Sequence, residues 1–346
     1  MATIYDVAAQ AKVSPKTVSR VLNQDDKVHP KTRLKVETAI QALGYIPSSA
    51  ARIMRSNRSG IIGLITGAIS RTTDGSRGKG LPDMFLVQGA QQAVARSGKI
   101  LMVADTDNGF DNIEPLMRTF MAHRAEGILY VAEKHQEVLL PPQSVNCPVV
   151  LVNGFDKVGT PAVLPDDYRG QYELVKRIIA AGHQHIAYLT LPLSVEATAL
   201  RVAGYRQALL ESGIDYRPEW VTVGYPDDSN SSEALLQAID KVLALQPRPT
   251  VLCCGNDEMA MRVYGMLRTR QLRIPEDISV AGYDNYRTIA ETLFPPLTSM
   301  ELPYLEMGKQ AANLLLQLIE HIPAPNKPLL IQGNMVWRES VKTFNF

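Results

Sequence analysis

Short apolar runs alternate with amphipathic helical patterns along most of the chain, from residue 61 onward. The first four runs are IIGLIT, KILMVAD, EGILYVA and PVVLVNG, and helical patterns such as 85–97 and 111–124 lie between them. Strands that are buried on both faces of a parallel sheet have this continuous apolar character, and helices supply the crossover connections. The pattern therefore predicts a parallel sheet covered by helices.

A second series of the same kind follows. Its helical patterns and apolar runs alternate at 168–182, 185–192, 197–213, 219–226, 231–245, 250–257, 258–272 and 278–285. Two α/β units of this length can each bury a core, and a crevice is expected between them. Because open α/β sheets bind ligands beyond the carboxyl ends of their strands, polar residues at strand ends are candidates for ligand binding.

The first 47 residues follow a different pattern, with short helical segments separated by brief turns. Thr3 and Asp6 form a variant capping box that opens one helix, and Ser14 followed by Pro15 has the N-cap and first-turn chemistry that opens a second. Only residues 11–13 separate the two segments. So short a connection predicts that the helices meet at a steep angle, as in a helix-turn-helix.

The second of these helices has an apolar inner face and a polar outer face. Val18, Val21 and Leu22 face inward, and the outer face carries Lys16, Thr17, Ser19, Arg20 and Asn23. Short hydroxyl side chains can approach phosphates closely, and two cations four residues apart can reach base edges in a major groove. A third helix is predicted from Pro30 to Leu43, ending at Gly44.

The N-terminal region also differs from the rest of the chain in its net charge. Residues 1–58 carry ten Lys and Arg against four Asp and Glu, a net charge of +6, whereas the remaining 288 residues carry 26 basic and 31 acidic side chains, a net charge of −5. This asymmetry is typical of a small N-terminal domain that binds a polyanion and is joined to a larger part of the chain with another role. Charge alone favours the simpler explanation of a solvated basic face. The helix spacing favours nucleic acid.

Length and composition exclude several classes of protein. A chain of 346 residues, 45% of them apolar, indicates two or three globular domains. No run of about 18 apolar residues and no signal-peptide pattern occurs, so we expect a cytoplasmic protein with no membrane partner. Without metal-ligand spacing or a catalytic set, we expect no enzyme activity, cofactor or metal. Cys147, Cys253 and Cys254 are expected to be reduced core thiols.

The N-terminal motifs resemble those of the LacI/GalR (lactose-repressor-like) family of bacterial transcriptional regulators. The segments TIYDVAAQAKVS, TVSRVLN, KTRLKVETAIQALGYIP and SSAARIMRS match its headpiece and hinge almost continuously. The resemblance implies that residues 14–23 form the recognition helix, with Lys16 and Arg20 reading bases. It implies phosphate contacts for Ser14, Thr17, Ser19 and Asn23, and further DNA contacts for Thr3, Tyr5, Thr32, Tyr45, Ala51 and Met54. Pro15 stands where the family often carries a base-reading side chain, and it has no donor.

By the same resemblance, residues 48–56 form a hinge helix that folds on operator DNA and enters the minor groove. A helix this short is not stable alone in water, so folding on contact is physically reasonable. Met54 stands in place of the family's leucine wedge, and methionine is also apolar and flexible enough to enter between base steps. The predicted domains are a headpiece at 1–47, a hinge and linker at 48–60, and a core at 61–346.

The core resembles the family's periplasmic-binding-protein-like fold. The fold prediction is therefore a small all-α helix-turn-helix headpiece joined by a hinge helix to an α/β core of two similar parallel-sheet subdomains. The chain is expected to cross between the two subdomains near residues 164, 295 and 324. One subdomain then consists of about 61–164 plus 295–324, and the other of about 165–294 plus 325–346. No leucine-rich heptad tail follows, so we expect a homodimer.

Polar residues near the predicted crevice are the effector candidates. Carboxylate, amide and guanidinium groups give directional hydrogen bonds to vicinal hydroxyls, and a tyrosine ring adds an apolar face. The predicted set is Asn153, Arg201, Tyr225, Asn256, Asp257, Asp284 and Tyr304. Arg201, Asn256 and Asp284 also match effector positions of the family. Asn256 and Asp257 are explained equally well as cap or turn residues.

Two features depart from the family. Residues 70–83 form a Gly/Ser-rich loop that is longer than expected, and it either shapes effector choice or is mobile. Leu302 stands where a glutamine is common, which removes one polar contact.

A periplasmic solute receptor would need a signal peptide in place of the basic head. The sequence therefore predicts an effector-responsive repressor of a carbohydrate-utilisation operon, which binds a near-palindromic double-stranded DNA operator as a dimer and responds to a sugar, sugar acid or polyol.

Overall fold

The computed structural model describes residues 2–46, 58–67, 81–106, 112–141, 145–227 and 230–344. The chain forms two compact units, Met1–Ser59 and Gly60–Phe346. The predicted DNA contacts Ala51 and Met54, and most of the predicted loop at 70–83, lie outside the described residues. The end of that loop is corrected, because residues 81–83 already belong to a helix.

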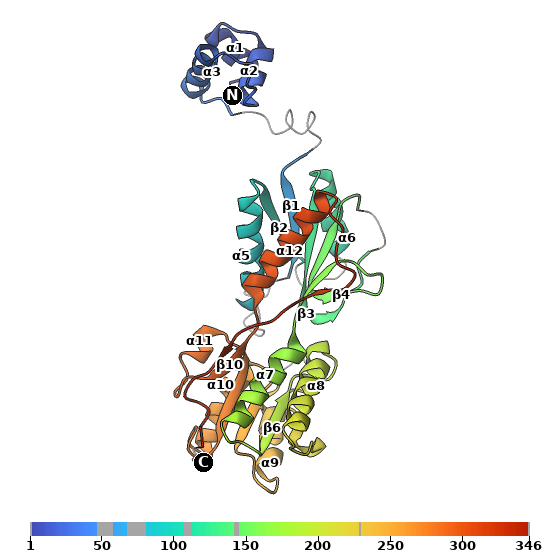
Figure 1. Cartoon of the computed structure of the whole chain (residues 1–346), viewed down its shortest axis with the longest axis vertical. Coiled ribbons are helices and arrows are strands. Elements are labelled where there is room, and N and C mark those ends of the chain that lie inside the picture. Colours follow the sequence, from blue (N-terminus) through green and yellow to red (C-terminus); the bar gives the residue numbers. More distant parts are fainter. Residues whose placement is uncertain are drawn as a thin grey trace. The chain divides into compact units, whose positions relative to one another are not determined.

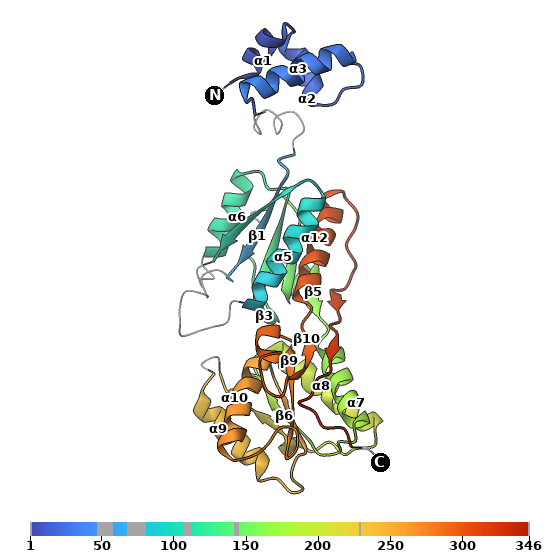
Figure 2. The same cartoon turned by 90° about the vertical axis from the view of Figure 1, so that its left-hand side faces the viewer.

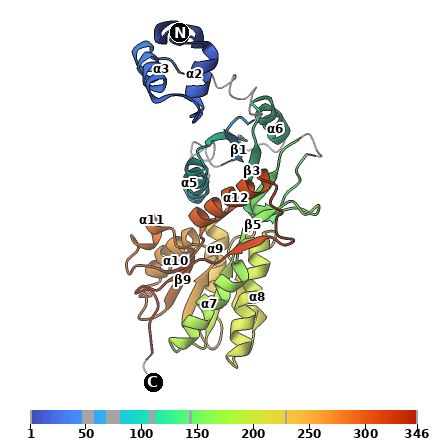
Figure 3. The ribbon, with the colours of Figure 1, turned by 45° about the horizontal axis from the view of Figure 1, so that its top comes forward.

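Residues 2–46 form a compact three-helix headpiece, drawn in blue in Figures 1 and 3. Its helices are α1 (Ile4–Ala11), α2 (Pro15–Leu22) and α3 (Pro30–Leu43). Val7, Val18 and Val36 have no exposed surface and form the centre of its small apolar core. The predicted helix-turn-helix is therefore confirmed, with a third helix packed against it.

The headpiece helices begin and end where their capping chemistry predicts. The hydroxyl of Thr3 accepts a hydrogen bond from the backbone N–H of Asp6, and the Asp6 carboxylate accepts one from the N–H of Thr3, so the capping box is present. Ser14 caps α2 by accepting from the N–H of Thr17 at 3.2 Å. Gly44 ends α3 with a φ of 57°, a conformation that glycine adopts without strain.

The described part of the second unit contains two six-stranded sheets. The first has the order β11 (Leu329–Ile331), β5 (Ala162–Pro165), β4 (Val149–Phe155), β3 (Gly127–Glu137), β1 (Ile61–Thr66), β2 (Ile100–Asp105). The second has the order β12 (Met335–Val336), β10 (Thr298–Glu301), β9 (Ser279–Asp284), β8 (Val251–Cys254), β6 (Ile186–Thr190), β7 (Val221–Val223). Neighbouring strands are parallel except that β12 runs antiparallel to β10.

Helices cover both faces of each sheet, which agrees with the continuous apolar runs of the strands (Figure 2). The first sheet packs against α5 (Leu81–Arg96) and α12 (Tyr304–Ile319) on one face and α6 (Ile113–Ala122) on the other. The second packs against α7 (Asp167–Ala180) and α8 (Glu196–Glu211), and on its other face against α9 (Ser232–Leu243) and α10 (Asp257–Thr269). Short helices at Pro218–Trp220 and Arg287–Ala290 (α11) complete the second subdomain.

Two of the predicted subdomain boundaries need correction. Residues 298–301 pair with β9 in the second sheet, so the crossing expected near 295 follows Glu301 instead. Residues 329–331 pair with β5 in the first sheet, so the crossing expected near 324 follows Ile331. Both strands have only three or four residues, which is too short for a recognisable apolar pattern.

Helices α5 and α12 lie side by side and meet through a pair of glycines (Figure 1). A Cβ atom on Gly308 would lie 2.1 Å from the carbonyl oxygen of Leu86, and one on Gly89 would lie 2.0 Å from that of Leu305. The Gly308→Ala variant must therefore push the two backbones apart. We expect it to lower the free energy of unfolding by about 1–3 kcal/mol in denaturant titrations.

Gly265 on α10 is the matched control, because a Cβ atom there would have no neighbour within 4 Å. Gly265→Ala should raise the free energy of unfolding by about 0.5–1 kcal/mol through the higher helix propensity of alanine. Equal effects of the two variants would contradict the close backbone approach.

Candidate DNA-binding and effector sites

The outer face of α2 presents two cations. Lys16 and Arg20 are exposed and lie one helical turn apart, as the sequence predicted. The Arg20 guanidinium forms a loose ion pair with Asp25, with 3.7 Å between Nε and Oδ2. Because both partners reach solvent, this pair contributes little stability and leaves the guanidinium able to turn to another partner.

The smaller polar residues of this face are engaged in local structure. The hydroxyls of Ser14 and Thr17 lie 3.0 Å apart at the helix cap, and the Asn23 amide donates to the backbone carbonyl of Ser19. The remaining predicted contacts are spread over the headpiece. Thr3 belongs to the capping box of α1, Tyr5 is exposed, Thr32 is half-buried on α3, and Tyr45 packs against the apolar core.

In the core, Arg201 on α8 is buried in a fixed set of contacts. Its Nε donates to Oδ1 of Asp167 at 2.7 Å, and Nη1 donates to the backbone carbonyl of Gly255 at 2.7 Å. The guanidinium also lies 3.6 Å from the centre of the Tyr283 ring. Burial opposes its charge, but the Asp167 carboxylate outweighs this and raises the pKa of Arg201 above its ordinary value. Arg201 is therefore a rigid cation at the strand ends, with Nη2 lacking a partner among the described residues.

Asp167 is a site residue that the sequence interpretation missed. It follows β5 and opens α7, where its carboxylate is fully buried and accepts from Arg201 and from His135, whose Nδ1 lies 2.7 Å from Oδ2. Burial raises its pKa, but Arg201 and His135 together lower that pKa below the ordinary value. The available signal was the acidic pair Asp166 and Asp167 directly after an apolar run. Asp166 is the N-cap of α7.

Asp284 ends β9 and has the properties of a binding residue. Its φ of 114° lies in the left-handed region, which is strained for any side chain, and its carboxylate has no hydrogen-bond partner among the described residues. Burial and the neighbouring carboxylate of Asp257 raise its pKa well above the ordinary value, while Arg201 opposes that shift. A half-buried carboxylate without a partner favours a ligand that can donate hydrogen bonds.

Asn256 and Asp257 have structural partners. Oδ1 of Asn256 caps α10 by accepting from the N–H of Met259 at 2.8 Å. Asp257 is completely buried and accepts from the hydroxyl of Ser299 at 2.6 Å and from the N–H of Tyr286 at 2.7 Å. Asn256 therefore acts as a helix cap, and the hydrogen bonds of Asp257 connect the start of α10 to β10 and to the segment after β9.

The other three predicted effector residues lie in different environments. Asn153, two residues before the end of β4, has a φ of 58° and donates to the carbonyl of Ala132 at 3.3 Å. Tyr225 is fully buried with Arg262 5.7 Å from its ring centre, so its ring does not present the free apolar face that was expected. Its hydroxyl is buried and has no hydrogen-bond partner among the residues that the structure describes. Tyr304 is half-buried at the start of α12, against the apolar clusters of both subdomains.

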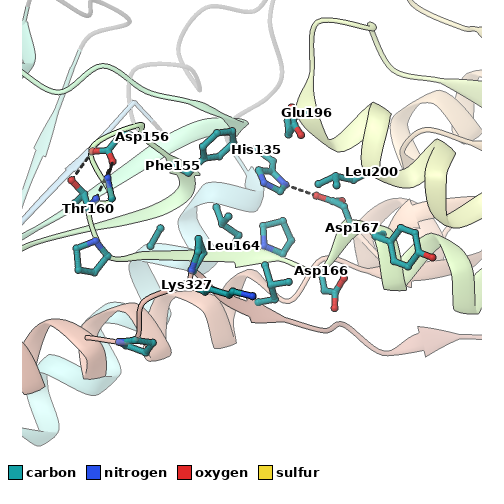
Figure 4. A pocket seen from close by; sticks show the side chains of 18 of the residues that line it. His135, Phe155, Asp156, Thr160, Leu164, Asp166, Asp167, Glu196, Leu200 and Lys327 are labelled. Carbon is teal, nitrogen blue, oxygen red and sulfur yellow. Dashed lines mark hydrogen bonds and ion pairs between the residues drawn. The ribbon is translucent and has the colours of Figure 1, made fainter. Parts of the chain in front are cut away.

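A cavity of about 400 Å³ lies beside the buried carboxylate of Asp167, and Figure 4 shows the residues that line it. Its walls come from the turn after β4, the start of α7, the first turns of α8 and the segment before β11. Apolar side chains such as Phe155 and Leu164 form much of the surface, while His135 and Asp167 supply buried polar groups. None of the seven predicted effector residues is among those that line it.

The cysteines have the predicted character. Cys253 and Cys254 are buried, Cys147 is half-buried, and all three are free thiols. Burial raises the pKa of Cys253 to about 12 and that of Cys147 to about 11, which keeps both thiols protonated and unreactive. Within the described ranges, no three His, Cys, Asp or Glu side chains are grouped to hold a metal ion. In the same ranges no helix is both long enough and apolar enough to span a bilayer.

A helix-turn-helix headpiece with exposed cations, followed by two parallel sheets with charged residues at their strand ends, defines a DNA-binding regulator with a ligand-binding core. Residues 3–48 match the lacI family of bacterial regulatory proteins, and residues 175–341 match a periplasmic binding protein-like domain. The chain belongs to the LacI family and is a DNA-binding transcriptional repressor. This confirms the expectation that it is a cytoplasmic regulator and not an enzyme.

Individual relatives match along nearly the whole chain. The HTH-type transcriptional repressor PurR of Aliivibrio fischeri (strain ATCC 700601 / ES114) is 30% identical over 346 residues, covering 99% of this chain and 98% of that protein. The structure of the Lac repressor dimer bound to operator and the anti-inducer ONPF is 26% identical, with a TM-score of 0.77 and 99% of each chain covered. The CelR–cellobiose complex is 27% identical, with a TM-score of 0.65, and covers 98% of this chain and 100% of that one.

The buried carboxyl of Asp257 makes stability depend on pH. Burial raises its pKa from 3.8 to about 7, although its hydrogen bonds with Ser299 and Tyr286 oppose the shift. Between these two values the folded protein binds a proton that the unfolded chain has released, so this carboxyl lowers the free energy of unfolding as the pH rises through the window. Asp257→Asn cannot titrate. The difference in unfolding free energy, wild type minus variant, should therefore decrease between about pH 4.5 and about pH 7.5 in denaturant titrations. A difference that is constant with pH would mean that Asp257 is ionised throughout.

Proposed function

We propose that this repressor binds a near-palindromic operator as a homodimer and controls a carbohydrate-utilisation operon in response to a sugar, sugar acid or polyol. The observation that carries the effector assignment is the carboxylate of Asp284, which has no hydrogen-bond partner within the described ranges and lies near the rigid guanidinium of Arg201. A carboxylate accepts and a guanidinium donates, so together they suit the vicinal hydroxyls of a polyol.

Tyr225 does not distinguish a sugar from a planar base. It is fully buried and packs beside Arg262, so its ring offers neither ligand a free apolar face. The relatives include both a protein named PurR and a regulator in complex with cellobiose, so the class of effector must be tested directly.

A thermal-shift screen of sugars, sugar acids, polyols and nucleosides on the purified full chain tests the effector class. A ligand that binds the folded state and not the unfolded chain raises the melting temperature, and the stabilisation grows with the logarithm of the ligand concentration above the Kd. We expect a carbohydrate or polyol to stabilise the protein and to change its affinity for operator DNA. Stabilisation by nucleosides alone would overturn the carbohydrate assignment.

The Asp284→Asn variant tests the effector site. Asparagine keeps the size of the side chain and tolerates a positive φ, but it removes the charge that strengthens hydrogen bonds from ligand hydroxyls. We expect affinity for the effector found in the screen to fall by about 10- to 100-fold in calorimetry, since a hydrogen bond to a charged group contributes about 1.5–3 kcal/mol. Asp215→Asn, at an exposed aspartate of the same subdomain, should bind as the wild type does. Unchanged affinity in Asp284→Asn would move the site elsewhere.

Direct base readout by α2 rests on Lys16 and Arg20, the exposed cations of its outer face. Arg20→Ala should weaken binding to an operator selected from random duplexes by about 1–3 kcal/mol and relax base preference at one position. Lys35→Ala removes one exposed positive charge from α3 without altering α2, so it should weaken selected and random duplexes equally. Titrations of both variants at one salt concentration give the comparison. If Arg20→Ala also left the specificity ratio unchanged, Arg20 would be a phosphate contact only.

A further inference from the structure

One hydrogen bond joins the two core subdomains at a buried position. His135 belongs to β3 of the first sheet, and its Nδ1 lies 2.7 Å from Oδ2 of Asp167, which opens α7 on the second sheet (Figure 4). The side chain of His135 is 5% exposed and that of Asp167 is fully buried. A buried carboxylate that loses a donor is strongly destabilised, so this bond contributes more than a contact of the same length at the surface.

The strand is shaped to make this contact. β3 pairs regularly with β4 as far as Val131, and the pairing resumes at Gln136 with a shifted register. His135 lies in this irregular part of β3, and β3 reaches α8 of the second subdomain. The ring of Phe155 meets the imidazole edge-on, with 6.0 Å between the ring centres, and fixes its orientation. Irregular strand ends of this kind are commonly used to aim a side chain.

The two oxygens of Asp167 are divided between the subdomains. Oδ2 accepts from His135 of the first subdomain, and Oδ1 accepts from Nε of Arg201 in the second. With one oxygen occupied by the imidazole, the carboxylate takes a single hydrogen bond from the guanidinium. Without His135, the same carboxylate is free to take the two-bond geometry that carboxylates and guanidinium groups favour, through Nε and Nη2. That geometry would withdraw Nη2 from a ligand.

We propose that the bond between His135 and Asp167 is a latch that holds the two subdomains in the arrangement seen here, and that His135 thereby positions Arg201. This goes beyond the proposed effector class, because the latch forms whatever ligand the core binds. His135 is a positioning residue, since it acts on the ligand site through Asp167. The latch links the closure of the subdomains to the number of guanidinium donors that face the ligand.

The test measures the distance between the subdomains without any ligand. Spin labels are placed at the exposed positions 91 on α5 and 241 on α9 of the full chain, in a background with Cys147→Ala, and mixed with excess unlabelled protein. Pulsed electron resonance then reports distances within one chain. His135→Asn keeps an N–H close to the place of Nδ1, whereas His135→Gln moves the amide toward the place of Nε2. We expect the distance distribution of His135→Asn to match that of the wild type, and His135→Gln and His135→Leu to add a longer, broader population.

His183→Leu is the matched control. His183 is equally buried and has two hydrogen bonds, at 2.8 Å to Thr250 and at 2.9 Å to the carbonyl of Lys342, all within the second subdomain. Its removal should lower the melting temperature without changing the distance distribution. The latch is overturned if His135→Gln and His135→Asn give the same distribution, or if His183→Leu broadens it as much as His135→Gln does. Asn and Gln are both small polar amides, so the comparison remains available if the leucine variant does not fold.

Discussion

A fully buried carboxylate must be neutralised by the groups around it, and in this core that constraint applies to Asp167. Its partner Arg201 is buried as well, so neither charge can be removed without leaving the other uncompensated. The guanidinium in turn is fixed by the backbone carbonyl of Gly255, which follows β8, and by the ring of Tyr283, which lies in β9. One ion pair therefore ties the start of α7, the helix α8 and the carboxyl ends of two strands into a single rigid site.

Two aspartates near that site show how environment separates groups of the same type. Asp257 follows the apolar strand β8 and Asp284 is the last residue of β9, and burial raises the pKa of each. Asp257 receives hydrogen bonds from Ser299 and from the backbone of Tyr286, so it serves the fold. Asp284 has no such partner in the described part of the chain and sits in a strained conformation. Strain and an unsatisfied polar group at one residue are the expected signs of a functional position.

Much of this architecture could be predicted from local signals. The headpiece helices were predicted correctly because Thr3, Ser14 and Gly44 supply capping chemistry that acts within a few residues. The long apolar strands of the core were predicted because burial on both faces leaves a continuous run. The short strands β10 and β11 were missed because three or four residues carry no period, and two boundaries were misplaced with them.

The candidate site was predicted less completely, since partners distant in sequence decide which strand-end residue binds a ligand. Nothing local distinguishes Asp257, whose carboxylate accepts from a serine and a backbone N–H, from Asp284, for which the described part of the chain supplies no hydrogen-bond partner. The contact of His135 with Asp167 joins residues 32 positions apart across two subdomains, so no spacing rule reveals it. The ring of Tyr225 was expected to face the crevice, but burial of a residue after a short strand is fixed by tertiary packing.

The departure at Leu302 sharpens the chemistry of the proposed effector site. Leu302 packs in the apolar cluster of the second subdomain, and its N–H donates to the carbonyl of Asp284 at 3.1 Å. A glutamine here would add an amide that both donates and accepts beside Asp284, whereas leucine offers the ligand no hydrogen bond. Polar recognition in this part of the site then depends on the carboxyl group of Asp284 and on a guanidinium that only donates. A hydroxyl can satisfy either group, so such a site favours a ligand with several adjacent hydroxyls over one with fixed donor and acceptor edges.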